Sequence, residues 1–449
     1  MKKTLIHNVK IVDDRKTFRG YVLIEGKHIL MVGEGDIDGE ITGNIDHAID
    51  GAGKMLVPGC IDEHVHFRDP GLTHKADMAT ESRAAVAGGV TSFIDMPNTN
   101  PATVTVAALN DKLEHAARVS VANFGFFIGA TNGNIDELRK ADRSKTAGIK
   151  LFIGSSTGNM LVDRQATIRE IMETVPMLIA VHAEDEGTIC NNRQTLVEKY
   201  GDNLPIDFHP VIRSHEACLK ATEGIVALAK ETGARLHVLH ISTADELRLF
   251  SSGSIEGKKI TAETCPQYLL FDDRMYSSFG SRIKCNPAIK HSSDRDALLK
   301  AVADDVIDVV ATDHAPHLLA EKEGTALTAV SGMPMIQFSL PVMLELSKAG
   351  YFTPEQVVEK MANNPARLFG IDGRGFIKEG FYADLTLVDM DCDPYTVTSD
   401  MVMSKCGWSP LEGMALSVKV EMVWVNGNLV NSHGIIIGGE KGEALRFSR

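Results

Sequence analysis

The residues best suited to chemistry begin with two histidines near residue 65. His64 and His66 are two positions apart, so in an extended strand their side chains point to the same face. Two imidazoles on one face supply half of a site for a divalent metal ion. Sixteen histidines in 449 residues give about 0.6 such pairs by chance. Taken alone, the pair is therefore explained equally well by a polar strand end.

Three further candidate ligands follow other short apolar runs of the chain. His182 and His240 each lie at the end of such a run, and Asp313 directly follows a third. Core packing explains these residues poorly, because a buried histidine needs a hydrogen-bond partner and a buried carboxylate is rarely left unpaired. If the runs are strands of one barrel, their carboxyl ends meet at one mouth, where barrel enzymes hold their catalytic groups.

Lys150 lies within another apolar run, at residues 148–153. A lysine inside a barrel strand is costly unless it is paired or modified. A salt bridge, or an amine that reaches water, is the simpler interpretation. Beside four histidines and an aspartate, a second interpretation gains weight: a neutral amine could react with carbon dioxide to form a carbamate that bridges two cations. Imidazole and carboxylate-type ligands with an open coordination position suit Zn²⁺.

These residues must be positioned by strands, and short apolar strands alternate with helical patterns from about residue 56 to residue 370. Eight strands are predicted, at residues 55–61, 91–96, 123–128, 148–153, 177–182, 235–241, 260–264 and 306–312. Helices are predicted between them, at residues 75–87, 104–118, 164–173, 215–230 and 294–303. Eight such units are typical of a (β/α)8 TIM barrel. A doubly wound open sheet is the alternative, but it does not need eight units, and no GxGxxG motif is found.

Both chain ends have strand patterns instead. Apolar or β-branched runs occur at residues 4–12, 21–25, 28–32, 383–388 and 417–425. Asn426 and Gly427 then give a type I′ hairpin signal. We expect the two ends to meet as a small β-sandwich. This α/β chain is thereby divided into residues 1–55 (first part of the sandwich), 56–375 (the barrel) and 376–449 (second part of the sandwich).

The predicted cluster favours metal-assisted hydrolysis. Two close metal ions would lower the pKa of a water molecule between them and polarise a carbonyl oxygen. Asp313 would be both a ligand and the general base that passes a proton to a leaving nitrogen. The predicted reaction is hydrolysis of an amide-like bond, or its reverse. A serine or cysteine nucleophile is less favoured, because the sequence has no GxSxG motif and no recognisable catalytic cysteine pattern.

Several polar residues near the same strand ends are candidates for substrate contacts. Arg68 lies two residues after His66, on the same face if the chain stays extended, and an arginine suits a substrate carboxylate. Asn98 and Asn286 can donate and accept hydrogen bonds, although both are also typical turn residues. His317 is a further candidate anion contact, with a surface histidine as the alternative.

A polar stretch at residues 318–331 follows these candidates. Gly324 and Gly332 bracket part of it, which is the pattern of a lid. A plain surface loop explains the same composition equally well.

Composition narrows the class of partner and the compartment. The chain has 60 acidic and 46 basic residues and a formal net charge of −14, which argues against binding to nucleic acid or to anionic lipid. Its seven cysteines form an odd set without a CxxC pair, as expected for free thiols in a reducing compartment. The N-terminus has no signal-peptide pattern, and no apolar run approaches the roughly 20 residues needed to cross a bilayer. We expect a cytoplasmic protein with a small-molecule partner.

Four motifs extend over nearly the whole chain and resemble the amidohydrolase superfamily and, within it, the dihydroorotases. They are Val57–His66, Asp95–Thr99, Asn364–Arg367 and Gly380–Leu385. The resemblance implies a (β/α)8 barrel with a β-sandwich built from both chain ends. It also implies two Zn²⁺ ions bridged by carbamylated Lys150 and held by His64, His66, Lys150, His182, His240 and Asp313. It implies Asp313 as the catalytic residue, and substrate contacts from His66, Arg68, Asn98, Asn286, His317 and the main chain near Gly332.

Within that superfamily, His66–Gly71 and Met96–Thr99 are most similar to dihydroorotases. Allantoinases usually have an asparagine at the Arg68 position, and hydantoinases and dihydropyrimidinases lack the matching Asn98, although Glu263–Leu269 is similar to theirs. The expected function is reversible cyclisation of N-carbamoyl-L-aspartate to L-dihydroorotate in pyrimidine biosynthesis. The alternatives are an allantoinase or hydantoinase/dihydropyrimidinase acting on a neutral cyclic amide, and a non-catalytic barrel scaffold. A homodimer is a further expectation.

Overall fold

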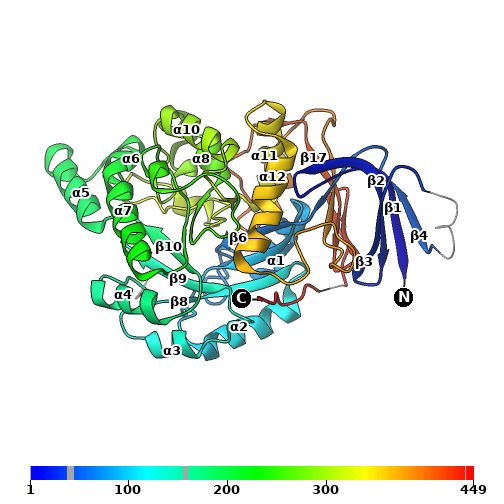
Figure 1. Cartoon of the computed structure of the whole chain (residues 1–449). Coiled ribbons are helices and arrows are strands. Elements are labelled where there is room, and N and C mark those ends of the chain that lie inside the picture. Colours follow the sequence, from blue (N-terminus) through cyan, green and yellow to red (C-terminus); the bar gives the residue numbers. More distant parts are fainter. Residues whose placement is uncertain (1, 38–44, 155–159, 440, 449) are drawn as a thin grey trace.

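The computed structural model of the chain describes residues 2–37, 45–154, 160–439 and 441–448. Its centre is a ring of eight parallel strands whose spatial order follows the sequence (Figure 1). They are β6 (Cys60–Val65), β7 (Val90–Asp95), β8 (Asn123–Gly129), β9 (Gly148–Ile153), β10 (Ile179–Ala183), β11 (Leu236–Val238), β12 (Ile260–Thr264) and β13 (Val309–Val310). A parallel bridge between Val65 and His314 brings the last unit against the first. The predicted (β/α)8 barrel is confirmed.

Helices surround this ring, and some of them project away from it (Figure 1). They are α1 (Met78–Ala87), α2 (Val106–Val119), α3 (Ile135–Lys140), α4 (Gln165–Thr174), α5 (Glu186–Tyr200), α6 (His209–Ile212), α7 (His215–Thr232), α8 (Pro266–Leu270), α9 (Tyr276–Phe279), α10 (Ser292–Ala303), α11 (Ser339–Lys348), α12 (Pro354–Val358) and α13 (Asn364–Phe369). Helix α2 shows why they form. The Thr105 hydroxyl accepts a hydrogen bond from the Ala108 amide at 3.1 Å and caps the helix. Leu109 and Ala116, two turns apart, are both buried on its inner face.

The two chain ends form a separate nine-stranded sheet beside the barrel (Figure 1). Its strands are β1 (Lys3–Asp13), β2 (Lys16–Glu25), β3 (His28–Glu34), β4 (His47–Asp50), β5 (Met55–Pro58), β14 (Leu385–Asp389), β17 (Lys419–Val425), β18 (Asn428–Ser432) and β19 (Ile435–Ile436). The ends meet where β5 pairs antiparallel with β14. Asn426 and Gly427 both have positive φ, as the predicted type I′ turn between β17 and β18 requires. A short ribbon of β15 (Tyr395–Thr396) and β16 (Ala415–Leu416) lies outside this sheet.

The predicted strand at residues 55–61 is wrong as a single barrel strand. It is divided at Gly59, where β5 leaves the terminal sheet and β6 enters the barrel. The Gly59 amide donates to the Asp384 carbonyl at 2.8 Å, and a Cβ at this position would lie 2.2 Å from Thr91 Cγ2. Only glycine fits where the two sheets approach each other, and a continuous apolar run does not reveal such a switch. The domain boundaries at residues 55 and 375 stay a prediction.

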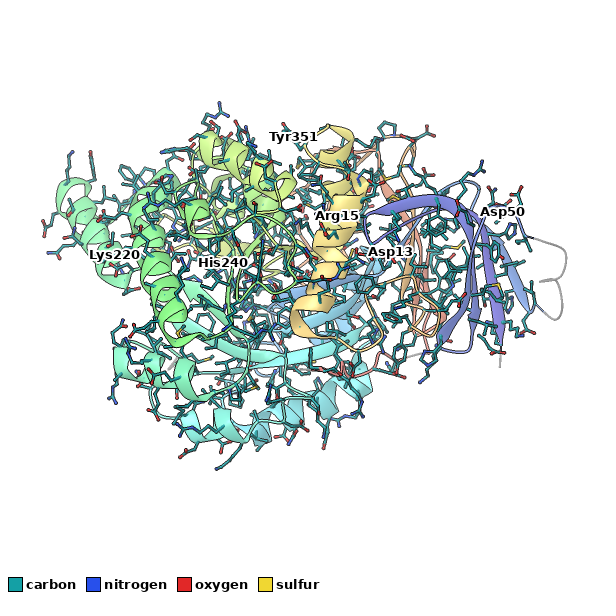
Figure 2. All side chains as sticks on the ribbon, viewed as in Figure 1. Asp13, Arg15, Asp50, Lys220, His240 and Tyr351 are labelled. Atoms are coloured by element: carbon teal, nitrogen blue, oxygen red, sulfur yellow. The ribbon has the colours of Figure 1, made fainter. Side chains whose placement is uncertain are left out.

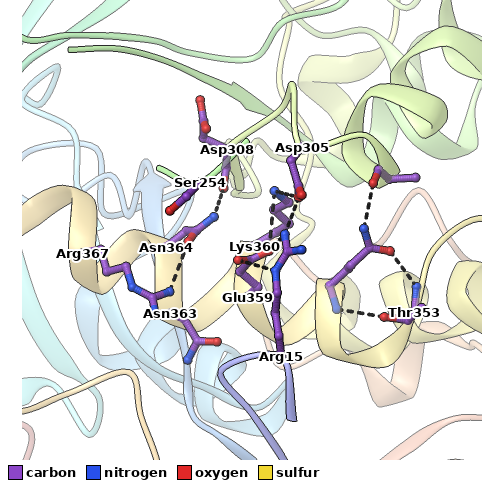
Figure 3. A network of polar contacts seen from close by, with 12 residues as sticks. Arg15, Ser254, Asp305, Asp308, Thr353, Glu359, Lys360, Asn363, Asn364 and Arg367 are labelled. Carbon is purple, nitrogen blue, oxygen red and sulfur yellow. Dashed lines mark hydrogen bonds and ion pairs between the residues drawn. The ribbon is translucent and has the colours of Figure 1, made fainter. Parts of the chain in front are cut away.

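A network of charged side chains joins the terminal sheet to the barrel (Figure 3). Arg15, in the turn between β1 and β2, lies 2.6 Å from both Asp305 and Glu359. Lys360 donates to the same Asp305 carboxylate at 2.8 Å. Asp305 precedes β13, whereas Asp313 follows it, so the network lies at the amino-terminal end of the strands. Contacts at that end stabilise a barrel and leave the opposite mouth free for a site.

Two further features concern the helices and the cysteines. Within the described part of the chain, no helix is both long and apolar enough to span a bilayer. All seven cysteines are free thiols, four of them buried. Burial raises the pKa of the Cys60 thiol well above its usual value, so this residue is not a nucleophile at neutral pH.

Candidate active site

A cavity of about 320 Å³ opens at the carboxyl ends of the barrel strands. It brings together every residue that the sequence analysis assigned to metal or substrate, which are His64, His66, Arg68, Asn98, Lys150, His182, His240, Asn286, Asp313, His317 and Gly332. Phe152, Ala315, Val330 and Ser331 complete its wall. Figure 2 shows His240 well inside the barrel half of the molecule. A larger cavity of about 680 Å³, between α2 and residues 443–446, has no histidine or cysteine among its described lining residues.

His64, His66 and Asp313 form the tightest part of this site. Asp313 Oδ1 lies 3.3 Å from His64 Nε2 and 3.0 Å from His66 Nε2. The Nδ1 atom of His64 is bonded to Glu263 Oε1 at 2.9 Å, and that of His66 to Asn98 Oδ1 at 2.7 Å. Burial lowers the pKa of His66 to about 4, so its ring is neutral at pH 7. When Nδ1 carries the proton, Nε2 turns a lone pair toward the Asp313 carboxylate.

His182 and His240 form the second part of the site. Nδ1 of His182 and Nε2 of His240 lie 2.8 Å apart, and the two rings are nearly perpendicular, at 79°. His182 Nε2 lies 3.0 Å from the buried Glu184 carboxylate. Burial would raise the pKa of Glu184, but the Arg213 guanidinium lowers it to about 2. Burial lowers the pKa of both histidines, so two neutral rings present adjacent nitrogens to the cavity.

Lys150, on β9, reaches the same cavity as a buried amine. Its side chain is almost fully buried, and its Nζ atom lies 4.6 Å from the centre of the Phe152 ring. No carboxylate among the described residues forms an ion pair with Nζ, so the salt-bridge interpretation does not apply to this part of the chain. Burial lowers the pKa of Lys150 to about 8. A substantial fraction of this amine is therefore neutral near pH 8 and able to act as a nucleophile.

Arg68 places a guanidinium group on the cavity wall. It is 8% exposed, its Nε donates to the Pro316 carbonyl at 3.1 Å, and its Nη2 lies 3.0 Å from His317 Nε2. Among the described residues, no carboxylate lies within ion-pair distance of its guanidinium. The prediction that Arg68 shares a strand face with His66 is wrong, because β6 ends at Val65 and Arg68 has a left-handed φ of +65°. That turn directs Arg68 to the cavity.

Asn98 and Asn286 face the cavity in different ways. Asn98 Oδ1 is occupied by His66, which leaves the amide NH₂ as the group available to a ligand. Asn286 Oδ1 is buried and has no hydrogen-bond partner among the described residues. An unsatisfied buried acceptor of this kind is relieved by a donor from a bound molecule or water.

Gly332 contributes the space that a side chain would fill. Its amide donates to the Lys284 carbonyl at 2.9 Å and its carbonyl accepts from Lys322 Nζ at 2.7 Å, so both backbone groups are already bonded. A Cβ here would lie 2.7 Å from the Ala315 carbonyl oxygen and 3.0 Å from His317 Cδ2. The small residue lets the loop pack directly against the His317 ring.

The predicted lid, residues 318–331, is held in place by a buried lysine of its own, Lys322. It begins with a short 3-10 turn, η6 (Leu319–Lys322). The buried ammonium of Lys322 donates to the carbonyls of Lys284, Val330 and Gly332 at 3.0, 2.8 and 2.7 Å. These contacts fold the segment against one wall of the cavity.

Comparison with known proteins identifies the family. Residues 55–430 match the Amidohydrolase family. A dihydroorotase of Halobacterium salinarum is 37% identical to this chain over 89% of it and 92% of its own length. The chain belongs to the amidohydrolase family. An allantoinase of Streptomyces avermitilis is 34% identical over 85% of each chain. The solved L-hydantoinase of Arthrobacter aurescens is 26% identical with a TM-score of 0.92, covering 99% of this chain and 100% of its own.

Membership of this family confirms the predicted class of enzyme, a hydrolase that acts on cyclic amides. Amidohydrolases are generally metal-dependent, and His64, His66 and Asp313 place candidate ligand atoms within 4.8 Å of one another. The donor set fits a cation. Two imidazole nitrogens and a carboxylate oxygen close together on one cavity wall are ligand types that Zn²⁺ accepts.

Sequence reasoning missed the carboxylates that orient the histidines. Glu263 bonds His64, Glu184 lies beside His182, and metal-binding histidines commonly have such partners. The sequence signal for them was an acidic residue inside a predicted strand, as for Glu263, or two residues after one, as for Glu184. Glu63 and His237, whose polar atoms lie 2.7 Å apart, continue the polar layer below Glu263.

Proposed function

We propose that this amidohydrolase is a dihydroorotase, which interconverts N-carbamoyl-L-aspartate and L-dihydroorotate. The observation that carries the proposal is Arg68, a buried guanidinium on the cavity wall without a carboxylate partner among the described residues. A buried charge is stable only when it is paired, and the substrate carboxylate would supply that pair. The dihydroorotase of Halobacterium salinarum, at 37% identity, supports the same substrate.

The same residues suggest how the reaction would proceed. Bound metal ions would polarise the ring carbonyl and acidify a water molecule beside it. Burial would raise the pKa of Asp313, but the neighbouring His64 and His66 lower it overall, so this residue is a carboxylate at neutral pH. As a carboxylate it can accept the proton of the attacking water and deliver it to the ring nitrogen that leaves. In the synthetic direction, Asp313 takes the proton from the ureido nitrogen instead.

We further propose two Zn²⁺ ions bridged by carbamylated Lys150. The donor atoms form two groups, with Asp313 between His64 and His66, and with His182 against His240. Lys150 lines the same cavity, and its buried amine is available in neutral form near pH 8. Carbamate oxygens are ligands of the carboxylate type that Zn²⁺ accepts.

The remaining substrate contacts would come from the cavity wall. The amide NH₂ of Asn98, the Asn286 side chain and the His317 ring face the same space as Arg68. A homodimer and a cytoplasmic location stay predictions.

Turnover of dihydroorotate, allantoin and dihydrouracil by the zinc-loaded protein tests the proposal. We expect dihydroorotate to be hydrolysed with the highest kcat/KM. The allantoinase of Streptomyces avermitilis, at 34% identity, makes allantoin the important alternative, and preference for allantoin or dihydrouracil would refute a carboxylated substrate. Zinc analysis of the same sample separates these outcomes from the non-catalytic scaffold, which would hold no stoichiometric metal and hydrolyse none of the three.

A further inference from the structure

His317 lies between two cations that approach its two ring nitrogens. Arg68 Nη2 is 3.0 Å from Nε2, and Lys75 Nζ is 3.0 Å from Nδ1. Burial, followed by the charges of Arg68 and Lys75, lowers the pKa of His317 far below its usual value, so the ring is neutral. A neutral imidazole has one lone pair for hydrogen bonding and one N–H group. It can accept a hydrogen bond from only one of the two cations, and its N–H must face the other.

Lys75 is the one of these two cations whose charge is paired with a carboxylate among the described residues. Its ammonium lies 2.7 Å from Glu321 Oε1, so its charge is balanced and its position is held. The other oxygen of this carboxylate, Glu321 Oε2, is 3.7 Å from His317 Nδ1, which is too far for a hydrogen bond with the ring. An ammonium group has only donors, so its contact with Nδ1 requires the lone pair to be on Nδ1. The His317 ring is itself immobilised, since Trp408 Nε1 donates to its carbonyl at 2.7 Å and Gly332 packs against its edge.

The proton of His317 is then on Nε2, which faces the cavity and Arg68. Two donors that face each other at 3.0 Å are unfavourable unless an acceptor lies between or beside them. A carboxylate satisfies both, because its oxygens accept from the imidazole N–H and from the arginine fork. Lys75 is absent from the cavity wall, so it does not itself reach such a ligand.

We propose that Lys75 is a positioning residue, which holds His317 as the Nε2–H tautomer so that His317 and Arg68 together bind the substrate carboxylate. This inference rests on the proposed function for the identity of the anion. Lys75 would thus be a determinant of substrate specificity that contacts the His317 ring but does not line the cavity. A neutral cyclic amide gains nothing from this arrangement, since it has no carboxylate to accept from the two donors.

The tautomer can be observed directly by ¹⁵N NMR of the zinc-loaded protein labelled in its histidines. His317→Gln assigns the His317 signals by their disappearance. We expect a protonated Nε2 and an unprotonated Nδ1 in the wild type, and a mixture of tautomers in Lys75→Met. Lys75→Arg retains a cationic donor and is expected to restore the Nε2–H tautomer. An unchanged tautomer in Lys75→Met, or Nδ1–H in the wild type, would overturn the proposal.

Kinetics supply the second readout. Lys75→Met is expected to raise the KM for dihydroorotate by about tenfold, the loss of one hydrogen bond to a charged group, and to leave kcat within about twofold. The matched control Lys140→Met, an exposed lysine of α3, is expected to keep the wild-type KM. An unchanged KM in Lys75→Met, or an equal rise in KM for a neutral ring substrate, would refute the specificity role.

Glu321→Gln separates the tautomer from simple anchoring of the loop. It removes the ion pair to the 318–331 segment but keeps the Lys75 ammonium beside His317. We expect this variant to retain the Nε2–H tautomer. If it loses the tautomer as completely as Lys75→Met does, Lys75 acts by holding the loop and the proposal fails. If the wild type hydrolyses dihydrouracil or allantoin but not dihydroorotate, the proposed function fails. The NMR experiment is independent of that result, because it still shows which nitrogen of His317 is unprotonated beside Lys75.

Discussion

His66 Nδ1 and Asn98 Oδ1 are hydrogen bonded at 2.7 Å, and this contact directs the opposite nitrogen of the ring toward Asp313. Asn98 is therefore as much a partner of a candidate metal ligand as a candidate substrate contact. Asn98→Ala is expected to weaken zinc affinity about 10–100-fold, as loss of such partners generally does. Competition with a chromogenic chelator measures this change. Asn110→Ala, an exposed position on α2, is the control, and equal zinc affinity in both variants would contradict the assignment.

Asp313→Asn tests the proton transfer. The amide keeps the shape of the carboxylate but cannot accept the proton of the attacking water. We expect kcat to fall by about 10²–10⁴-fold, the usual contribution of a general base, while zinc is retained. Elemental analysis and steady-state kinetics on the same sample check both parts. Asp296→Asn, at an exposed carboxylate of α10, should change neither quantity. Near-normal turnover in Asp313→Asn would remove its role as base.

Arg68→Met tests the charge of the substrate. The variant removes the guanidinium and keeps an apolar side chain of similar length. We expect the KM for dihydroorotate to rise about 10–100-fold, the loss of hydrogen bonds to a charged group, with zinc content unchanged. The KM for dihydrouracil should not rise in parallel. An unchanged KM for dihydroorotate would indicate that a neutral ring occupies the site.

Asp13, which lies outside the candidate active site, is expected to make the stability of the fold depend on pH. Burial raises its pKa to about 6, although Asn363 and the Ile377 amide both donate to it. A carboxyl group with a raised folded-state pKa favours folding at low pH, and that contribution is lost as the pH rises through about 6. Asp13→Asn removes the buried charge and keeps one of the two oxygens that accept from Asn363 and the Ile377 amide. We expect its stability relative to the wild type to be greater at pH 7 than at pH 4.5, by on the order of 1–2 kcal/mol.

Thermal unfolding of the wild type and Asp13→Asn between pH 4.5 and 7.5 measures this effect as a difference. The Tm of Asp13→Asn relative to that of the wild type should rise between pH 4.5 and about 6 and stay constant above it. Asp36→Asn, at an exposed carboxylate, should show no such trend. A gap that does not change with pH would refute the raised pKa of Asp13.

The alternation of strands and helices was enough to predict the barrel, because buried parallel strands are apolar throughout and leave a clear pattern. It was also enough to bring the candidate ligands to one mouth, since His182 and Asp313 lie at or just beyond strand ends. The division at Gly59 was not predictable, because both halves of the run are equally apolar. It depends on the approach of Thr91 and Asp384 from distant parts of the chain.

The directions of the side chains in the site were the second feature that could not be predicted from the sequence. Arg68, His240 and Asp313 all have positive φ, between +43° and +65°, which places them off the strand faces that a period of two predicts. Such left-handed residues concentrate at functional sites. The contact between Lys75 and His317 spans 242 positions, and neither local spacing nor residue type indicates it.

The pairing of β5 with β14 has a consequence for the order in which the protein is made. Residues 55–58 leave the ribosome more than 300 residues before their partner strand at 385–389. During that interval one edge of β5 has no neighbour from β14, while the eight barrel strands are still being synthesised. Unpaired strand edges are prone to association with other chains. This edge of β5 can pair with β14 only after residue 389 has been made, so the terminal sheet is completed after all the barrel strands.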